Sequence, residues 1–228
     1  MPSAGPQPLT IAVEGAQPVS GLIDAPADAR ACFVLAHGAG AGMTHPSMAA
    51  VAAGLSERGV AVLRYQFPFM EQGSRRPDPP AVAHAAVRAA VAEAARRLPG
   101  LKLVAGGRSF GGRMTSQAQA IAPLPGVRGL AFLAFPLHPA GRVSTERARH
   151  LSDVHVPMLF LQGTRDALAD AGEMQALAAR LGGRATLRLW QDADQSFKVP
   201  ARSGRTEAEV RAEILDALTV WIEGLSCA

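Results

Sequence analysis

The segment GRSFG, residues 107–111, matches the pattern G-x-S-x-G and is the clearest chemical signal in the chain. The apolar residues 101–107 predict a strand and residues 109–121 predict a helix, which is the setting that gives this pattern its meaning. A serine held at such a bend presents its hydroxyl as a nucleophile toward an acyl carbon. The helix beginning there directs unpaired N–H groups toward developing negative charge. Alternatively Ser109 only caps the helix, because serine is also a favoured N-cap residue.

The glycine-rich stretch HGAGAGM, residues 37–43, directly follows the apolar strand predicted for residues 31–36. A turn of this kind can bring a backbone N–H toward the serine, and a second donor comes from the residue after the nucleophile. The sequence therefore predicts an oxyanion hole made by the N–H groups of Ala39 and Phe110, with Gly40 as the alternative to Ala39.

The same loop permits a second interpretation, as part of a dinucleotide-binding fingerprint. Gly38, Gly40 and Gly42 follow a strand, and Arg64 ends the next predicted strand, where a 2′-phosphate could bind. However, Met43 occupies the position of the third glycine in G-x-G-x-x-G. This interpretation also leaves the serine motif unexplained, so the hydrolytic one is preferred.

A nucleophilic serine needs a base and an acid that orients it. Asp166 follows the buried strand predicted for residues 156–163, where a carboxylate can hold an imidazole, although it could also be an ordinary turn residue. The base is expected after the last strand, in residues 191–197, which read QDADQSF. No histidine occurs after His155, and Gln195 lies where the base is expected.

These motifs resemble those of one family. The stretches HGAGAGMTHPSM, RYQFPFME, GGRSFGGRM, FPLHPAGR, LFLQGTRDAL and DADQSFKVP are similar to those of small, lid-less α/β-hydrolases related to dienelactone hydrolase. They are most similar to the bacterial branch whose eukaryotic relatives include the testis-expressed hydrolase-like proteins. The resemblance implies Ser109 as nucleophile, Asp166 as acid and hydrolysis of small carboxylic esters or lactones without a cofactor. Relatives carry histidine in the form D-H-S-F where this chain has Gln195.

The glutamine changes the expected activity. Its amide can hydrogen-bond to both Ser109 and Asp166, but it has no pKa that would let it take the serine proton near neutral pH. The chain is therefore expected to be a weak hydrolase or a catalytically inactive binding protein with the same fold. Among the other histidines, His138 is the first candidate for a substitute base, followed by His37 and His45, whereas His84, His150 and His155 are assigned to the surface or to packing.

Residues around the predicted site supply candidate substrate contacts. Loops at the carboxyl ends of the strands contain several aromatic and apolar residues, which form either an acyl pocket or a plug over the core; they are Phe67, Phe69, Met70 and Phe197. Three cations could attract an anionic substrate or simply be solvated: Arg108, Arg113 and Lys198. The candidate contacts are His37, Gly40, Phe67, Arg108, His138 and Phe197.

Strand-like and helix-like segments alternate along the chain, which predicts an α/β fold with about eight mostly parallel strands and helices on both faces. An antiparallel pair is predicted at residues 9–15 and 19–26, a loop at residues 67–80 and a polar connection at about residues 138–155. The further strands are expected at residues 31–38, 59–65, 101–107, 127–136, 156–163 and 184–190, and the helices at residues 45–58, 81–98, 109–121, 169–181 and 206–224. A single domain over residues 1–228, without a large lid, is expected.

The composition limits the class of protein. The 228 residues are 48% hydrophobic and 18% charged, and 23 Lys and Arg against 19 Asp and Glu give a formal net charge of only +4, without a basic stripe. Neither nucleic acid nor a membrane is therefore an expected partner. Cys32 and Cys227 cannot form a disulfide framework, and the start of the chain lacks a secretory signal pattern, so a cytoplasmic monomer or homodimer is expected. No histidine pair has the spacing of a zinc site, so no metal is expected.

Overall fold

The structure, a computed structural model, describes residues 5–226, so the expectations about Cys227 and the first four residues lie outside it. Its eight strands form one sheet in the order β1-β2-β4-β3-β5-β6-β7-β8. The strands are β1 (Gln7–Ile11), β2 (Val19–Asp24), β3 (Ala31–Ala36), β4 (Val60–Tyr65), β5 (Lys102–Arg108), β6 (Val127–Leu133), β7 (Met158–Gly163) and β8 (Ala185–Trp190). The helices are α1 (Pro46–Ser56), α2 (Pro68–Glu71), α3 (Pro80–Arg97), α4 (Phe110–Ile121), α5 (Ala171–Leu181) and α6 (Glu207–Gly224).

The pairing of the strands explains where functional side chains can meet. β1 pairs antiparallel with β2, and β2 pairs antiparallel with β4, whereas all other neighbours are parallel. β5 lies between β3 and β6, near the middle of the sheet. Because parallel strands end at the same edge, the loops after β3, β5 and β7 lie along one edge of the sheet. The predicted antiparallel pair and the predicted mostly parallel sheet are confirmed.

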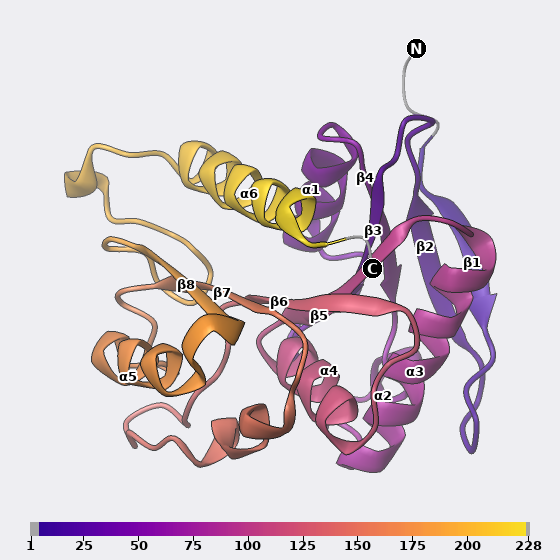
Figure 1. The fold of residues 1–228 in the computed structure, drawn as a ribbon, viewed down its shortest axis with the longest axis horizontal. Coiled ribbons are helices and arrows are strands. Elements are labelled where there is room, and N and C mark those ends of the chain that lie inside the picture. The colour runs from indigo at the N-terminus through magenta and orange to yellow at the C-terminus, as the bar shows by residue number, and fades with distance from the viewer. Residues whose placement is uncertain (1–4, 227–228) are drawn as a thin grey trace.

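Helices cover both faces of the sheet, and each face has its own apolar core (Figure 1). On one face, Met48 and Leu55 of α1 pack with Ile214 and Leu218 of α6. On the other face, α3, α4 and α5 supply apolar residues such as Val87, Met114 and Leu177. The strands between them are nearly continuous apolar runs, as expected for strands buried on both faces. The predicted layers are confirmed.

Two segments predicted to be irregular contain short helices. Residues 67–80 hold the single turn α2, with Pro68 at its first position, and residues 138–155 hold the 3₁₀ helix η1 (Glu146–Asp153). Two further 3₁₀ turns are η2 (Gly182–Arg184) and η3 (Ala201–Ser203). In the described part of the chain, no helix combines the length and the apolar character needed to span a membrane.

Candidate active site

Ser109 lies at the sharp turn between β5 and α4. Its backbone has φ 48° and ψ −114°, a conformation that costs a non-glycine residue about 1–3 kcal/mol. The Ser109 N–H donates to the carbonyl of Leu133 at 3.0 Å, which ties the turn to β6. Although Ser109 occupies the N-cap position of α4, its side chain makes no capping hydrogen bond. The alternative that Ser109 serves only as a helix cap is therefore wrong.

The two outer glycines of the motif are required by close contacts with the neighbouring strand. A Cβ on Gly107 would lie 2.3 Å from the carbonyl oxygen of Ala36, and one on Gly111 would lie 2.5 Å from that of His37. Both distances are far below van der Waals contact. The end of β3 and the loop after it therefore pack directly against the turn, and a Cβ on Gly38 would be 3.9 Å from that of Ser109.

The glycine-rich loop after β3 is held by side chains from β4 and the residue after it. Arg64 donates to the carbonyl of Met43 at 3.0 Å, and Oε1 of Gln66 accepts from the N–H of Met43 at 2.9 Å. Arg64 also pairs with Asp24 at 3.0 Å, and its side chain is only 3% exposed. Because Arg64 is buried and bonded in this way, it cannot bind a nucleotide phosphate. The dinucleotide-binding interpretation is wrong.

His37 holds this loop through hydrogen bonds of both its ring nitrogens. The N–H of Phe67 donates to Nε2 of His37 at 2.9 Å, so Nδ1 carries the proton and donates to the carbonyl of Gly38 at 2.7 Å. Burial lowers the pKa of His37 to about 4, which keeps the ring neutral at physiological pH. The ring thus has both nitrogens engaged with backbone groups, and its role is to connect the loop to residue 67.

The two predicted oxyanion donors are available. Within residues 5–226, the N–H groups of Ala39 and Phe110 donate to no acceptor of the protein. Phe110 is the first residue of α4, so its N–H belongs to the unpaired helix start, and Ala39 lines the pocket that contains Ser109. Two unpaired donors beside a nucleophilic hydroxyl can stabilise a negatively charged oxygen.

Gln195 contacts the nucleophile directly. Its Nε2 donates to Oγ of Ser109 at 3.0 Å. The loop that carries it is ordered by Asp194, whose Oδ1 accepts from the N–H groups of Ser196 at 2.7 Å and Lys198 at 3.0 Å. Arg108 also donates to the carbonyl of Gln195 at 3.2 Å. The structure therefore places the side chain of Gln195 against the hydroxyl of Ser109, at the position where a base is expected from the sequence.

Asp166 is buried near this loop but does not pair with Gln195. Its carboxylate accepts from Nε2 of Gln162 at 2.5 Å and from the N–H of Leu168 at 2.8 Å. No hydrogen bond joins it to Gln195 in the described part of the chain, so the expectation that the amide bridges both partners is wrong. Burial raises the pKa of Asp166 to about 6, with a smaller contribution from the negative charge of Asp194.

His138 is not placed to act as a base. It is 4% exposed, and Nε2 accepts from the N–H of Asp170 at 3.0 Å while Nδ1 contacts the carbonyl of Pro139 at 2.9 Å. Nε2 therefore holds Asp170, the residue before α5, and Nδ1 is engaged with the backbone of the adjacent residue. His45 does line the Ser109 pocket, but its Nδ1 accepts from the N–H of Ser47 at 3.2 Å and caps α1.

The pocket around Ser109 has a volume of about 520 Å³. Of the candidate substrate contacts, Gly40, Arg108 and Phe197 line it, together with Lys198. The other three candidates do not line the pocket, which corrects the prediction. They are buried outside it: His37, Phe67 and His138. Phe67 and Phe69 belong to an aromatic cluster with His37 and Phe110, so they fill the core as the plug alternative predicted.

Sequence reasoning missed one wall of the pocket, which comes from α1 and α6. Met48 and Val51 of α1 line it beside Ile214 and Leu215 of α6. The sequence predicted both helices, at residues 45–58 and 206–224, but only the three-dimensional structure shows that they border a cavity. Two exposed charges on the first turns of α6 complete the wall, Glu207 and Arg211.

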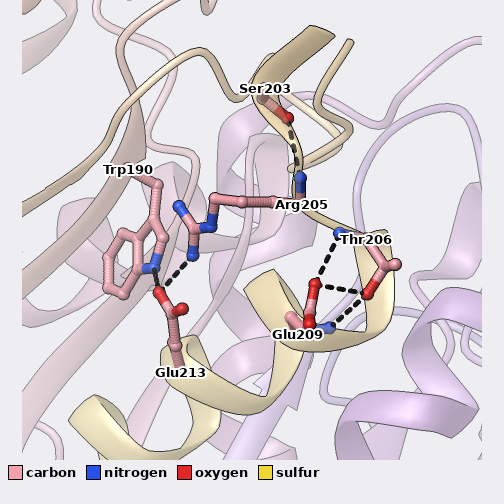
Figure 2. Close-up of polar contacts among 6 residues, drawn as sticks. All are labelled: Trp190, Ser203, Arg205, Thr206, Glu209 and Glu213. Carbon is pink, nitrogen blue, oxygen red and sulfur yellow. Dashed lines mark hydrogen bonds and ion pairs between the residues drawn. The ribbon is translucent and has the colours of Figure 1, made fainter. Parts of the chain in front are cut away.

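Polar contacts fix the start of α6 (Figure 2). Thr206 caps the helix and forms a reciprocal capping box with Glu209. Glu213 accepts from Nε1 of Trp190 at 3.1 Å and pairs with Arg205, which ties the helix to the end of β8. These contacts position the turn of α6 that carries Glu207 and Arg211.

The described residues of this region do not provide a set of metal ligands. Among residues 5–226, no group of three or more His, Cys, Asp or Glu side chains is placed to hold a metal ion. The polar groups that face the pocket are instead the serine hydroxyl, the glutamine amide, backbone N–H groups and charged side chains.

Comparison with known proteins agrees with this fold. The chain is similar in structure to an α/β serine hydrolase homologue from Coxiella burnetii (18% identity, 93% of this chain and 97% of the other, TM-score 0.75). It is also similar to a lid-less α/β serine hydrolase from Xanthomonas campestris (21%, 98% and 96%, 0.73) and to a dienelactone hydrolase from Anabaena variabilis (17%, 97% and 99%, 0.75). The family model described as "Alpha/beta hydrolase domain" matches residues 29–223. The chain therefore belongs to the α/β-hydrolase domain family.

Proposed function

We propose that this protein is a serine hydrolase for small carboxylic esters or lactones, with Ser109 as nucleophile and a slow turnover imposed by Gln195. The observation that carries the proposal is the strained backbone of Ser109, which holds the hydroxyl in a pocket beside the unpaired N–H groups of Ala39 and Phe110. Backbone strain of this kind is retained where the surrounding structure enforces it, and here Gly107 and Gly111 allow β3 to do so.

The reaction follows from these positions. Oγ of Ser109 attacks the carbonyl carbon while its proton passes to water, the Ala39 and Phe110 N–H groups bind the resulting oxyanion, and cleavage of the ester bond releases the alcohol, whose oxygen takes a proton from water. Water then hydrolyses the acyl-enzyme and releases the carboxylic acid. A lactone would open in the same way, with the alcohol remaining attached to the acid.

The proton of Ser109 determines the rate. In a complete triad an imidazole accepts it, whereas the amide of Gln195 donates to Oγ and has no basicity near neutral pH. Loss of the base costs about 10⁶ in turnover in a well-studied serine protease, and positioning with the oxyanion hole retains ~10³–10⁴ over water. A measurable but slow reaction is therefore expected.

A second function is favoured by the same hydrogen bond. Because Nε2 of Gln195 donates to Ser109, the serine is held as a hydrogen-bonding group rather than activated as a nucleophile. The protein would then be a catalytically inactive binding protein that uses the same pocket for a small molecule.

The two functions are distinguished by one paired assay. Hydrolysis of short p-nitrophenyl esters and labelling by a fluorophosphonate are measured for the wild type, Gln195→His, Ser109→Ala and the double variant. A gain of at least ~10³-fold in Gln195→His, lost with Ser109→Ala, supports the hydrolase. Absence of activity and labelling in Gln195→His rejects it in favour of the binding protein, and equal Ser109-dependent activity in wild type and Gln195→His would show another base.

A further inference from the structure

We infer that the Ser109 pocket is a receptor for monocarboxylates with a short apolar chain, the carboxylate lying against Ser109 and the chain lying between α1 and α6. This inference deepens the proposed function, because it identifies the carboxylic acid side of the ester as the part that the pocket recognises. It rests on the direction of the hydrogen bonds at Ser109, the charges that line the pocket and the position of its apolar wall.

The groups around Ser109 are hydrogen-bond donors toward the pocket. Oγ of Ser109 accepts from Gln195, and its own O–H has no acceptor within the described residues, so it can donate to a ligand. A basic imidazole in the place of Gln195 would instead draw this proton away from the ligand. With the N–H groups of Ala39 and Phe110, Ser109 presents three donors to one small volume, which suits an anionic oxygen better than a neutral one.

Charged side chains lining the pocket favour the same ligand. Arg108, Lys198 and Arg211 line it, against a single carboxylate, Glu207. Asp166 does not line the pocket, and Oδ1 of Asp194 is occupied by two backbone N–H groups. The lining therefore carries an excess of two positive charges, which attracts an anion and disfavours a cation.

The apolar wall identifies the rest of the ligand. Met48 of α1 and Ile214 and Leu215 of α6 line the pocket and are nearly fully buried, and Phe197 also lines it. These side chains come from the core of one face of the sheet, so they form a pre-built surface rather than an exposed patch. A short alkyl chain attached to the carboxylate would pack against this wall and so remove its own apolar surface from water.

The volume limits the size of the ligand. About 520 Å³ is at the lower end of the range for small-molecule pockets. Such a pocket accommodates an acid of several carbons, whereas a bare acetate has no alkyl chain to pack against the apolar wall. Hexanoate is therefore a suitable probe, and acetate tests the contribution of the chain.

Isothermal titration at pH 7.5 with hexanoate, acetate and hexanamide tests the inference on the wild-type protein. Hexanamide has the shape of hexanoate but no charge, so it cannot form the charge-assisted hydrogen bonds of the carboxylate. We expect hexanoate to bind at least ~10-fold more tightly than hexanamide, from the charge-assisted hydrogen bonds, and at least ~10-fold more tightly than acetate, from the apolar chain. Equal affinity for hexanoate and hexanamide, or no heat with millimolar hexanoate, overturns the inference.

Variants locate the binding. Gln195→Glu places a negative charge against the carboxylate and should weaken hexanoate binding at least ~10-fold, and Ser109→Ala should weaken it several-fold by removing one donor. Gln72→Glu makes the same change of charge at an exposed position after α2 and should bind as the wild type does. If circular dichroism shows that Gln195→Glu does not fold, the affinity of Ser109→Ala for hexanoate tests the inference instead. Wild-type affinity in Ser109→Ala overturns the inference.

The outcome is separable from that of the proposed hydrolase. Hexanoate binding with no fluorophosphonate labelling of Gln195→His would retain the receptor and reject the hydrolase. Labelling and ester cleavage by Gln195→His, without hexanoate binding by the wild type, would retain the hydrolase and reject the receptor.

Discussion

The two sides of the Ser109 pocket are held by different kinds of contact. On the side of the elbow, the sharp turn of residues 107–111 that carries Ser109, β3 and its loop lie against Gly107 and Gly111 so closely that no side chain fits between them. On the side of Gln195, Ala193 lies equally close to Gly163 of β7, but residues 200–206, which lead to α6, are held by polar contacts, several of them at the surface, as between Glu213 and Arg205. The elbow is therefore built into the packing of the sheet, whereas the segment that leads to α6 is attached at the surface.

This difference shows why the elbow does not depend on the residue at position 195. None of the contacts that hold Ser109 in its strained conformation involves Gln195; they come from Leu133 and from the end of β3. The carboxylate on the other side responds differently. Asp166 is buried without a cation hydrogen-bonded to it, and its pKa is raised to about 6 as a result. An imidazolium at residue 195 would supply the missing positive charge.

The largest expected effect concerns Asp166 and depends on residue 195. In a Gln195→His background, Asp166→Asn should lower kcat/KM for a p-nitrophenyl ester by about 10⁴, because the carboxylate would orient and stabilise the imidazole. In the wild type, the same substitution should change kcat/KM by less than about 10-fold, because Asp166 makes no hydrogen bond to Gln195. A double-mutant cycle measures the coupling, and equal losses in both backgrounds would contradict the comparison.

Adding one methyl group at Gly107 tests how closely β3 packs against the turn that carries Ser109. Gly107→Ala places a Cβ 2.3 Å from the carbonyl oxygen of Ala36, and we expect the free energy of unfolding to fall by at least about 3 kcal/mol in urea titrations. Gly183→Ala is the matched control, because a Cβ there meets nothing within 4 Å, and its effect should stay within about 1 kcal/mol. Similar effects of both substitutions would show that the elbow is not enforced by β3.

Much of the fold could be predicted because its signals are local. The alternation of apolar runs with helical segments gave the order of the elements, and the setting of Ser109 between β5 and α4 gave the elbow. The position of Gln195 beside Ser109 followed from the motif around it. The short helices α2 and η1 were missed because Pro68 in α2 and the polar and charged residues of η1 are equally typical of loops.

The roles of buried polar residues could not be predicted, because they depend on which backbone groups lie nearby in space. His37, His138 and Phe67 were taken as substrate contacts from their position after strands, but burial and backbone hydrogen bonds make them part of the support. Likewise the partner of Asp166 is Gln162 of β7, whose polar side chain gave no signal within an otherwise apolar strand. The α1–α6 wall required the packing of distant helices.

A smaller effect on stability is expected from Asp166→Asn. The pKa of Asp166 in the folded state, about 6, exceeds the value near 3.9 expected in the unfolded state. At a pH between these two pKa values the folded state therefore binds more protons than the unfolded state. This group therefore contributes most stability at low pH, and the contribution is lost as the pH rises through about 6. Asparagine removes the buried charge, and its NH₂ can donate to the unpaired Oε1 of Gln162.

We therefore expect Asp166→Asn to raise the free energy of unfolding by about 2 kcal/mol at pH 7.5 and to have little effect at pH 4.5. Urea titrations at the two pH values measure it. Asp153→Asn, at an exposed carboxylate of η1, is the control and should shift stability by less than about 0.5 kcal/mol at either pH. A loss of stability at pH 7.5 in Asp166→Asn would show that the carboxylate is favourably paired in the folded state.

The smallest effect is expected on the attached side, at Glu213 (Figure 2). Glu213→Gln keeps an acceptor for Nε1 of Trp190 but removes the ion pair with Arg205, and both charged side chains are partly exposed, at 53% and 30%. Because exposed ion pairs contribute little, the free energy of unfolding should fall by less than about 1 kcal/mol, and by less still in 1 M salt. Tryptophan fluorescence, from Trp190 and Trp221, measures the free energy of unfolding in urea. A loss above about 2 kcal/mol would place residues 200–206 within the cooperative core, so that both sides of the pocket would be built into the sheet alike.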